Sequence, residues 1–404
     1  MKQSIAIRTV RVIDGTGHTI ERATVIIRGT TIAAIGSDRE ISIPPGATKI
    51  DGRGLTLLPG LIDCHVHFCL GAEPDVVAAI AQETPALNLL KASHAARQTV
   101  EAGFTTVRDV GSRDHSIFTL QQAIETGLVP GPRIVGAGLA ICMIGGHARF
   151  IGQEVAGVEQ VRSVVREQIA AGAGVIKVIA SGGVLTPGTS PDQAQMTMEE
   201  LQAAVDEAQK AGRKVAAHAH GSSGMKNAIR AGVHSIEHAT LMDEDAATLM
   251  KGRGVFMVPT LSALATTASC RLGCGVPESA RDKAKAMTKR HAVSFKNALR
   301  NGIPIAMGTD AGTPFNFHGE NAQELERMAS FGMSPMQAIL ASTSAAARLI
   351  GIQDRVGTIE KRKLADLVLF EGNPLRHIDR LQDRKRIIGV MQAGRWTAGP
   401  LSSR

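Results

Sequence analysis

The middle of the chain alternates β-type runs with helix-like segments, and this alternation limits the possible folds more than any other feature of the sequence. The β-type runs are residues 62–68, 105–110, 133–137, 175–180, 214–220, 235–239, 255–261 and 303–309. The helix-like segments between them include residues 87–102, 158–171, 198–211 and 282–301. Strands that alternate with helices form parallel sheets, and about eight such units favour an α/β fold of the (β/α)8 TIM-barrel type.

Both ends of the chain have a different pattern. Residues 4–50 contain short β-type runs separated by turn residues, and the stretch after Gly357 looks similar. Such runs are typical of antiparallel sheets. We therefore predict that residues 1–58 and 346–404 together form a small composite β-sandwich domain, and that residues 59–345 form the catalytic hydrolase barrel.

Residues that can contribute to a metal site stand at the predicted carboxyl ends of the strands. They are His65, His67, Lys177, His218, His238 and Asp310. Because successive side chains of a strand point to opposite faces, His65 and His67 can bind one ion from a single strand. A divalent ion with an open coordination position can produce hydroxide from water near neutral pH. Active sites of barrels lie at this end of the strands, so the pattern predicts a hydrolytic metal centre.

Lys177 lies between β-branched apolar residues in the middle of a predicted strand. A buried ammonium group is costly, so such a lysine either pairs with a carboxylate, extends its amine to the surface, or becomes a neutral amine. A neutral amine can take up carbon dioxide and form a carbamate, which is an anion. We expect this last alternative, because a carbamate can bridge two cations and lower their mutual repulsion.

His218 and His220 lie two residues apart and are expected to face the same end of the barrel. We predict that His218 binds a metal ion and that His220 lies further towards the substrate. There it could polarise a carbonyl group or hold a substrate carboxylate. A supporting hydrogen-bond role for His220 is the alternative.

Asp310 ends the last predicted strand, and His147 follows two glycines after the third. A carboxylate at position 310 can touch a metal ion, accept a proton from the attacking water and pass it to the leaving nitrogen. The alternative for Asp310 is a helix N-cap. The glycines before His147 allow close backbone approach, so we predict that His147 contacts the substrate.

Composition argues against several other classes of function. The 404-residue chain has a formal charge of +8, but its basic residues are spread and aromatic residues make up only 3%, so we expect no nucleic-acid partner. It contains no Tyr, so no phenol can polarise a substrate. No signal peptide or apolar run of the ~18 residues needed to span a membrane is present. The five cysteines form no C-x-x-C pair, which favours reduced thiols in a cytoplasmic protein and gives Cys270 and Cys274 no clear role.

Several motifs together resemble one superfamily over almost the whole chain. They are Pro59-Gly60-Leu61-Ile62-Asp63 with His65-Val66-His67, Thr105-Thr106-Val107-Arg108-Asp109, Ile176-Lys177 with Ala180-Ser181-Gly182-Gly183, Ile236-Glu237-His238 and Gly308-Thr309-Asp310. The pattern resembles the amidohydrolase superfamily, and within it the imidazolonepropionase-like branch. That branch includes zinc Xaa-Pro dipeptidases, carboxypeptidases and ochratoxin-type amidohydrolases.

The resemblance implies a binuclear site, usually with zinc. His65, His67 and Asp310 would hold the first ion, and His218 and His238 the second. Carbon dioxide added to Lys177, as N6-carboxylysine, would bridge both ions. Asp310 would be the proton shuttle, and the loop ending at His147 would contact substrate. Some relatives carry Tyr where this chain has His220. Members often form large homo-oligomers, commonly octamers.

These features predict a hydrolase of amide bonds next to a free carboxylate, as in dipeptides and N-acyl or aryl-acyl amino acids. Hydroxide held between the ions would attack the carbonyl carbon, with Asp310 as the shuttle. The alternatives are hydrolysis of a cyclic amide, imidazolone or lactone, and a non-catalytic scaffold, which the complete ligand set disfavours. A single-metal deaminase is disfavoured by Lys177. Specificity is expected in the loops at 69–87, 142–155, 262–279 and 311–324.

Overall fold

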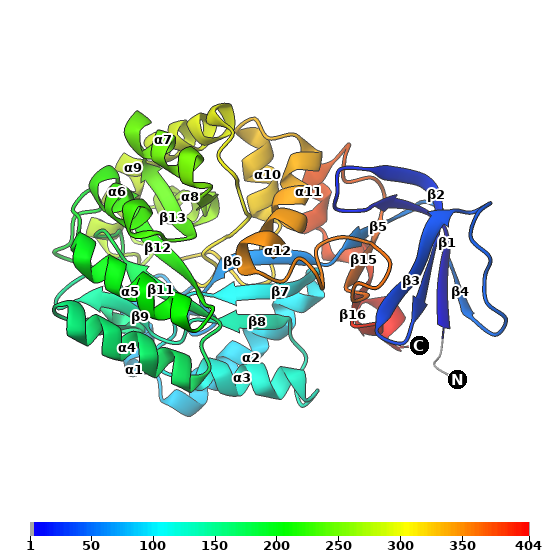
Figure 1. Cartoon of the computed structure of the whole chain (residues 1–404), viewed down its shortest axis with the longest axis horizontal. Helices are drawn as coiled ribbons and strands as arrows, with labels where there is room; N and C mark the ends of the chain where they lie inside the picture. Colours follow the sequence, from blue (N-terminus) through cyan, green and yellow to red (C-terminus); the bar gives the residue numbers. More distant parts are fainter. Residues whose placement is uncertain (1–3, 404) are drawn as a thin grey trace.

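The computed structural model of the protein describes residues 4–403, and its strands form three sheets (Figure 1). Two sheets are parallel, as the alternating pattern predicts. One has the order β6-β7-β8, with bounds Leu61–Val66, Phe104–Asp109 and Arg133–Gly136. The other has the order β10-β9-β11-β12-β13-β14, with bounds Gly152–Val155, Ala140–Met143, Val175–Ile179, Lys214–Gly221, Ser235–Leu241 and Phe256–Val258.

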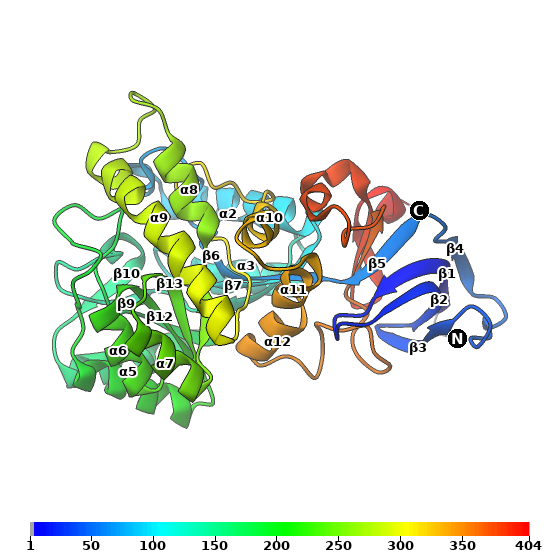
Figure 2. The ribbon, with the colours of Figure 1, turned by 90° about the horizontal axis from the view of Figure 1, so that it is seen from above.

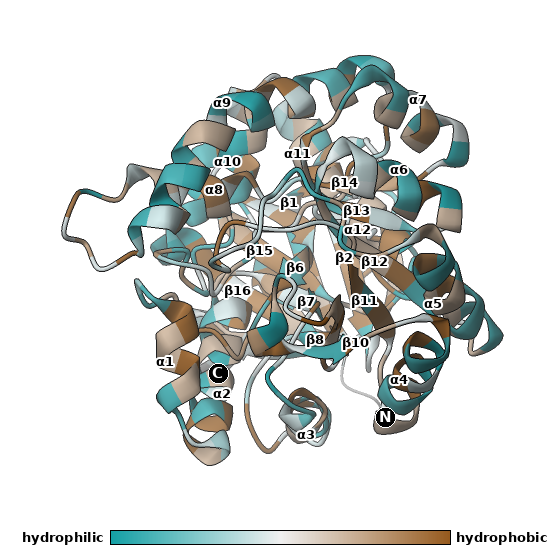
Figure 3. Cartoon of the chain, turned by 90° about the vertical axis from the view of Figure 1, so that its left-hand side faces the viewer, coloured by the Kyte–Doolittle hydropathy of each residue, from teal (hydrophilic) through white to brown (hydrophobic). Residues whose placement is uncertain are grey.

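Figure 3 shows the molecule from the side on which the parallel sheets lie, and helices surround the parallel strands in this view. They are α1 Val76–Gln82, α2 Pro85–Glu101, α3 Ser116–Glu125, α4 Val158–Ala171, α5 Met198–Lys210, α6 Ser222–Ala231, α7 Glu244–Arg253, α8 Leu261–Ser269, α9 Glu278–Asn301, α10 Gln323–Ser330, α11 Pro335–Ala341 and α12 Ser344–Ile350. Gly172 and Gly302 end α4 and α9 in the left-handed conformation that glycine adopts without steric cost.

The segment at 303–309 was predicted to be a strand, and the structure shows only an isolated bridge between Ile305 and Met257 there. Its backbone nevertheless lies between the two parallel sheets. Met257 N donates to Pro304 O at 2.9 Å, and Cys64 N donates to Met307 O at 2.9 Å. Pro304 has no N–H to donate, which prevents a regular ladder.

The two ends of the chain pair in one eight-stranded sheet with the order β17-β16-β15-β5-β1-β2-β3, and β4 pairs with β1. The strands are β1 Ser4–Ile13, β2 Thr19–Arg28, β3 Thr31–Ser37, β4 Thr48–Asp51, β5 Leu55–Pro59, β15 Leu367–Glu371, β16 Ile387–Gln392 and β17 Arg395–Ala398. Short 3-10 helices lie at Arg149–Ile151, Ile378–Gln382, Arg384–Arg386 and Pro400–Ser403. Figure 2 shows this end sheet at one side of the molecule. The two ends of the chain pair in one sheet, as predicted, whereas the two facing sheets of a β-sandwich are not confirmed.

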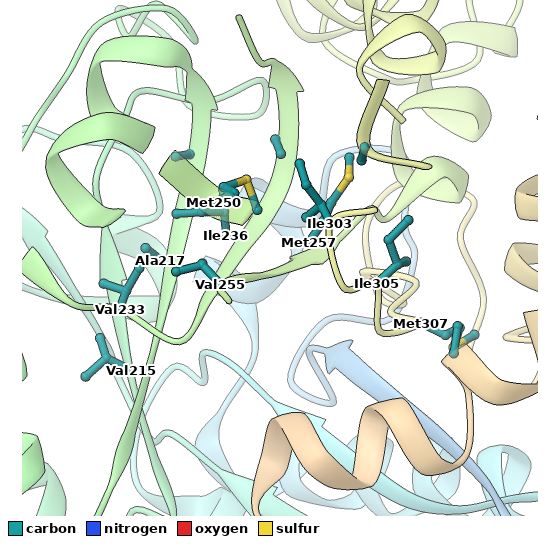
Figure 4. Close-up of a cluster of buried hydrophobic side chains, with 14 of the residues drawn as sticks. Val215, Ala217, Val233, Ile236, Met250, Val255, Met257, Ile303, Ile305 and Met307 are labelled. Atoms are coloured by element: carbon teal, nitrogen blue, oxygen red, sulfur yellow. The ribbon is translucent and has the colours of Figure 1, made fainter. Parts of the chain in front are cut away.

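A buried apolar cluster fixes the strands that lead to the carboxyl ends (Figure 4). Val215 of β12, Ile236 of β13 and Met257 of β14 pack with Ile303 and Met250, and all are at most 4% exposed. Burial of each large apolar side chain contributes about 1.5–3 kcal/mol. The strand ends, and the polar residues on them, are therefore held by a well-packed core.

The structure corrects the expectation for two cysteines, because Cys270 and Cys274 form a disulfide in the loop between α8 and α9. Their Cα atoms lie 6.1 Å apart, within the span that a disulfide bridges, since the loop between the two helices folds back on itself. Cys64, Cys69 and Cys142 are free and buried, as expected. No helix in residues 4–403 has the length and apolar character required to cross a membrane.

Candidate metal centre

All eight residues that the sequence singled out line one cavity at the carboxyl ends of the parallel strands. They are His65, His67, His147, Lys177, His218, His220, His238 and Asp310. The structure therefore brings together side chains that lie up to 245 positions apart in the sequence. Each of them is at most 9% exposed, so their charges and lone pairs act in a largely water-excluded site.

His65, His67 and Asp310 form one group in this cavity. The Nε2 atoms of His65 and His67 lie 3.4 Å and 3.2 Å from Asp310 Oδ1. Asp310 has a φ of 61°, a left-handed conformation that turns its side chain back towards β6, and its N–H donates to His65 O at 2.7 Å. Burial opposes the charged form of Asp310, but the adjacent His65 and His67 imidazoles hold its pKa well below the usual range.

The remaining nitrogen of each of these two imidazoles is already bound to an oxygen. His65 Nδ1 lies 2.8 Å from Glu237 Oε2, and His67 Nδ1 lies 2.8 Å from Gly111 O. Carboxylate and carbonyl oxygens accept only, so both Nδ1 atoms carry the proton and donate it. The Nε2 atoms of His65 and His67 face Asp310 and, when unprotonated, offer their lone pairs to a metal ion, which is the usual arrangement around metal-bound histidine.

His218, His220 and His238 form a second group, with ligand atoms that all lie within 4.8 Å of one another. The ring of His238 lies 4.6 Å from that of His218 and 4.7 Å from that of His220, measured between centroids. Burial, followed by the neighbouring basic side chains, lowers the pKa of all three well below the ordinary value. They are therefore neutral near pH 7, as metal binding requires.

Hydrogen bonds distinguish the nitrogens of this second group. His238 Nδ1 lies 2.7 Å from Thr260 Oγ1, which leaves its Nε2 facing the cavity. His218 differs, because its Nε2 donates to Gly182 O at 3.2 Å and its Nδ1 is left with the lone pair. His220 Nδ1 lies 2.8 Å from Thr240 Oγ1. Distance alone does not separate His218 from His220, but both face the cavity from β12 as predicted.

Lys177 is 2% exposed, and its side-chain amine makes no ion pair or hydrogen bond with any residue in the described range 4–403. Burial lowers the pKa of its amine to about 8, although Glu237 and Asp310 act in the opposite direction. Two alternatives weighed from the sequence, a carboxylate partner and an amine that reaches the surface, therefore do not apply. Lys177 lines the same cavity as the two groups of histidines.

His147 lines the same cavity, with its ring 4.6 Å from that of His218. Its Nδ1 lies 2.9 Å from Thr186 Oγ1, and burial lowers its pKa to about 3, so the imidazole is neutral. A Cβ at Gly183 would lie 2.2 Å from His147 Nε2, so only glycine fits at that position. His147 therefore lines the cavity, and its contact with substrate stays a prediction.

Arg108 and Glu237 are two functional residues that the sequence did not identify individually. Arg108 Nη2 donates to Glu237 Oε1 at 2.8 Å, and Arg108 Nε donates to Cys64 O at 2.6 Å. Burial opposes ionisation of Glu237, but Arg108 and then His65 lower its pKa to about 2. A charged carboxylate therefore holds His65. The available signal was a glutamate inside an apolar strand, directly before His238.

Two buried aspartates hold the backbone around the first group. Asp63 accepts from Thr309 Oγ1 at 2.6 Å and from Asn321 Nδ2 at 2.7 Å, which ties β6 to the segment that carries Asp310. Asp109 accepts from Phe68 N at 2.8 Å, so it holds the backbone that follows His67.

Comparison with known proteins agrees with this geometry. The model of the amidohydrolase family matches residues 56–397, which is most of the chain. The protein belongs to the amidohydrolase family. Ochratoxinase from Aspergillus niger is 32% identical over 96% of this chain and 85% of its own. Membership confirms the resemblance seen in the sequence and supports a hydrolytic enzyme that acts on amide-type bonds.

Two solved amidohydrolase structures show how closely the fold is shared. A Xaa-Pro dipeptidase with methionine bound in its active site is 36% identical, with a TM-score of 0.91 over 98% of this chain and 99% of that one. A prolidase complexed with N-methylphosphonate-L-proline is 33% identical, with a TM-score of 0.90 over 98% and 99%. The α/β fold with parallel sheets is therefore that of the family.

Proposed function

We propose that this amidohydrolase is a binuclear metal-dependent hydrolase of amide bonds next to a free carboxylate, as in dipeptides and N-acyl or aryl-acyl amino acids. One observation carries the proposal: a single buried cavity gathers the complete ligand-type set, and each histidine of that set has one nitrogen bound to a neighbouring oxygen and the other directed at Asp310 or the cavity. Such an arrangement serves metal binding and has little value for packing alone.

The donor set suits two divalent ions, with zinc as the first expectation. His65, His67 and Asp310 would hold one ion, and His218 and His238 the other. Lys177, carrying a carbamate formed with carbon dioxide, would stand between them. Nitrogen and carboxylate ligands of this kind are typical of zinc. When bound, the ions would supply a Lewis acid and an activated water.

The side chains around this site provide the proton transfers and the orientation of the substrate. Asp310 is ionised at neutral pH, so its carboxylate can accept a proton from the attacking water and deliver it to the leaving nitrogen. His147 and His220 are neutral and face the cavity, so their free nitrogens orient the substrate through hydrogen bonds and not through charge.

The cavity wall supports a substrate with an apolar portion. Leu70, Phe150, Ile151, Leu185 and Leu264 line it beside the polar residues. The relatives that carry methionine and an L-proline derivative hold amino-acid-derived molecules, which supports an amino acid on one side of the scissile bond.

The proposal extends to the assembly and its location. We propose a closed (β/α)8 barrel at 59–345, completed by the backbone bonds around Pro304, with residues 1–58 and 346–404 as the companion domain. We further propose a homo-oligomer, up to an octamer, in the cytoplasm.

Matched substrates test the proposed function. We expect hydrolysis of N-acyl amino acids with apolar side chains, and a loss of kcat/KM of about tenfold or more when the same compound carries a carboxamide in place of its carboxylate, since a hydrogen bond to a charged group contributes about 1.5–3 kcal/mol. Rates are measured by release of the free amino acid. Equal rates for the two compounds, or hydrolysis of cyclic amides alone, would contradict the proposal.

A further inference from the structure

Lys283 of α9 binds the backbone of a loop that lies over the cavity. Its Nζ donates to the carbonyl oxygens of Gly183, Thr186 and Thr189 at 3.4, 3.2 and 2.6 Å. An ammonium group has three N–H donors and no acceptor, so this set uses all of them. Within residues 4–403 no carboxylate lies within ion-pair distance of Lys283, so the three carbonyls are its partners.

The residues at 182–189, hereafter the cap loop, follow β11 and contain no helix or strand. The loop is closed on itself by Thr189, whose Oγ1 donates to Gly183 O at 3.3 Å and to Thr186 O at 3.0 Å. Thr189 O has Lys283 as its partner instead. The internal bonds shape the loop, and Lys283 attaches the shaped loop to α9.

The cap loop contacts the candidate site on its substrate side. Thr186 Oγ1 lies 2.9 Å from His147 Nδ1 and accepts from Ala148 N at 3.3 Å. Val184 and Leu185 line the cavity between His147 and α8. Movement of this loop would therefore shift one hydrogen-bonding residue and two apolar wall residues together.

We propose that Lys283 is a positioning residue that fixes the cap loop over the cavity and thereby sets the affinity for substrate. Its ammonium never reaches the reacting atoms, because it acts through the carbonyls and through Thr186. The kinetic part of this inference rests on the proposed function, whereas the anchoring of the loop does not.

Because Lys283 is partly buried, the loss of this anchor is costly. Its amine is partly removed from water, which lowers its pKa, and the three charge-assisted bonds compensate for that desolvation. In Lys283→Met the apolar stem is kept and the carbonyls of Gly183 and Thr186 retain Thr189 as a donor. The loop should therefore lose its polar attachment to α9, while Val184 stays in an apolar cluster with Ala280 and Ala284 of that helix and the rest of the fold stays intact.

Hydrogen exchange on the whole protein tests the anchor without any substrate. We expect the amides of Gly182 and Gly183, which donate to Gln193 O and Thr189 Oγ1, to exchange at least about tenfold faster in Lys283→Met, since removal of one charge-assisted bond has about that effect. Lys285→Met is the matched control, because Lys285 is exposed on the same helix. Unchanged protection in Lys283→Met would overturn the anchor.

Kinetics test the consequence for substrate. In Lys283→Met we expect KM to rise about tenfold and kcat to change less than about threefold, with partial rescue in Lys283→Arg, which also donates to carbonyls. Thr186→Val leaves the anchor intact and should raise KM alone. Two results for Lys283→Met would overturn the substrate role. One is faster exchange with an unchanged KM, and the other is a kcat and a metal content that fall together by the same factor. If the intact protein hydrolyses no amide, the proposed function fails and hydrogen exchange still decides the anchor.

Discussion

At the scale of single residues, the oxygen that binds each imidazole determines which nitrogen remains free. Glu237 fixes His65 from a strand 172 positions away, and Gly111 O fixes His67. The arrangement sets the tautomers before any ion arrives, because carbonyl and carboxylate oxygens accept only. Because the ligands need not rearrange, binding of a metal ion involves little unfavourable reorganisation free energy.

Asp310→Asn tests the proton-transfer role at this scale. The amide keeps an oxygen near His65 and His67 but cannot accept a proton, so kcat should fall by about 100-fold or more while KM changes little. Steady-state kinetics measure both values. Asp282→Asn, at an exposed position of α9, is the control and should be unaffected. Full turnover in Asp310→Asn would remove Asp310 as the shuttle.

The residues that hold the site could be predicted only in part. His65 and His67 were identified because their spacing is local and strands alternate strictly. Arg108 and Glu237 escaped notice, since their contact joins segments 129 positions apart and leaves no local pattern. The same reason applies to Lys283, which binds carbonyls of a loop 94 to 100 positions earlier.

At the scale of elements, the strands that carry ligands were the most predictable. The prediction at 175–180 agrees with β11, Val175–Ile179, because a buried parallel strand is a continuous apolar run bounded by turn residues. The prediction at 255–261 was too long. The strand ends at Val258, and α8 begins at Leu261 after a left-handed Thr260. Composition alone does not show where this strand ends and where the following helix begins.

The start of α8 contains a buried titratable group. Glu324 accepts from Leu261 N, Ser262 N and Ser262 Oγ at 2.7, 2.8 and 2.6 Å. Burial raises its pKa from 4.5 to about 7, although these bonds act in the opposite direction. The folded chain therefore binds a proton more tightly than the unfolded chain, and this contribution to the free energy of unfolding is lost as pH rises from about 4.5 to 7.

Glu324→Gln should remove this pH dependence. We expect the Tm of the natural chain, relative to that of the Gln variant, to fall as the pH is raised from about 5 to about 8. The corresponding loss in the free energy of unfolding is on the order of 3 kcal/mol for a pKa shift of this size. Thermal unfolding by circular dichroism across that range measures it. Glu326→Gln, exposed on the same helix, should show no such trend. A Tm difference independent of pH would contradict the assignment.

At the scale of the whole molecule, the end sheet is tied to the parallel strands. β15 pairs with β5 antiparallel, so the C-terminal end of the chain returns to the strand that leads into β6. Asp366, next to β15, accepts from Arg133 Nη1 of β8 at 2.7 Å and from Ala393 N at 2.8 Å. The meeting of the chain ends was predictable from their similar patterns, but these contacts were not.

Asp366→Ala should lower the free energy of unfolding by about 2 kcal/mol, since it removes hydrogen bonds to a buried, charged acceptor. The exposed pair between Arg97 and Glu101 provides the control, and Glu101→Ala should cost less than about 1 kcal/mol. Chemical denaturation of both variants measures the difference. Equal effects would show that the Asp366 contact does not join the two parts.

Elemental analysis of metal in the purified protein tests the central claim most directly. After supply of zinc and bicarbonate, the natural chain should hold about two ions, because the ligands form two groups around Lys177. Lys177→Ala should lose at least one ion and most turnover, whereas Lys285→Ala should keep both. A natural chain without bound metal, or a Lys177→Ala variant with a full complement of ions, would contradict the binuclear centre.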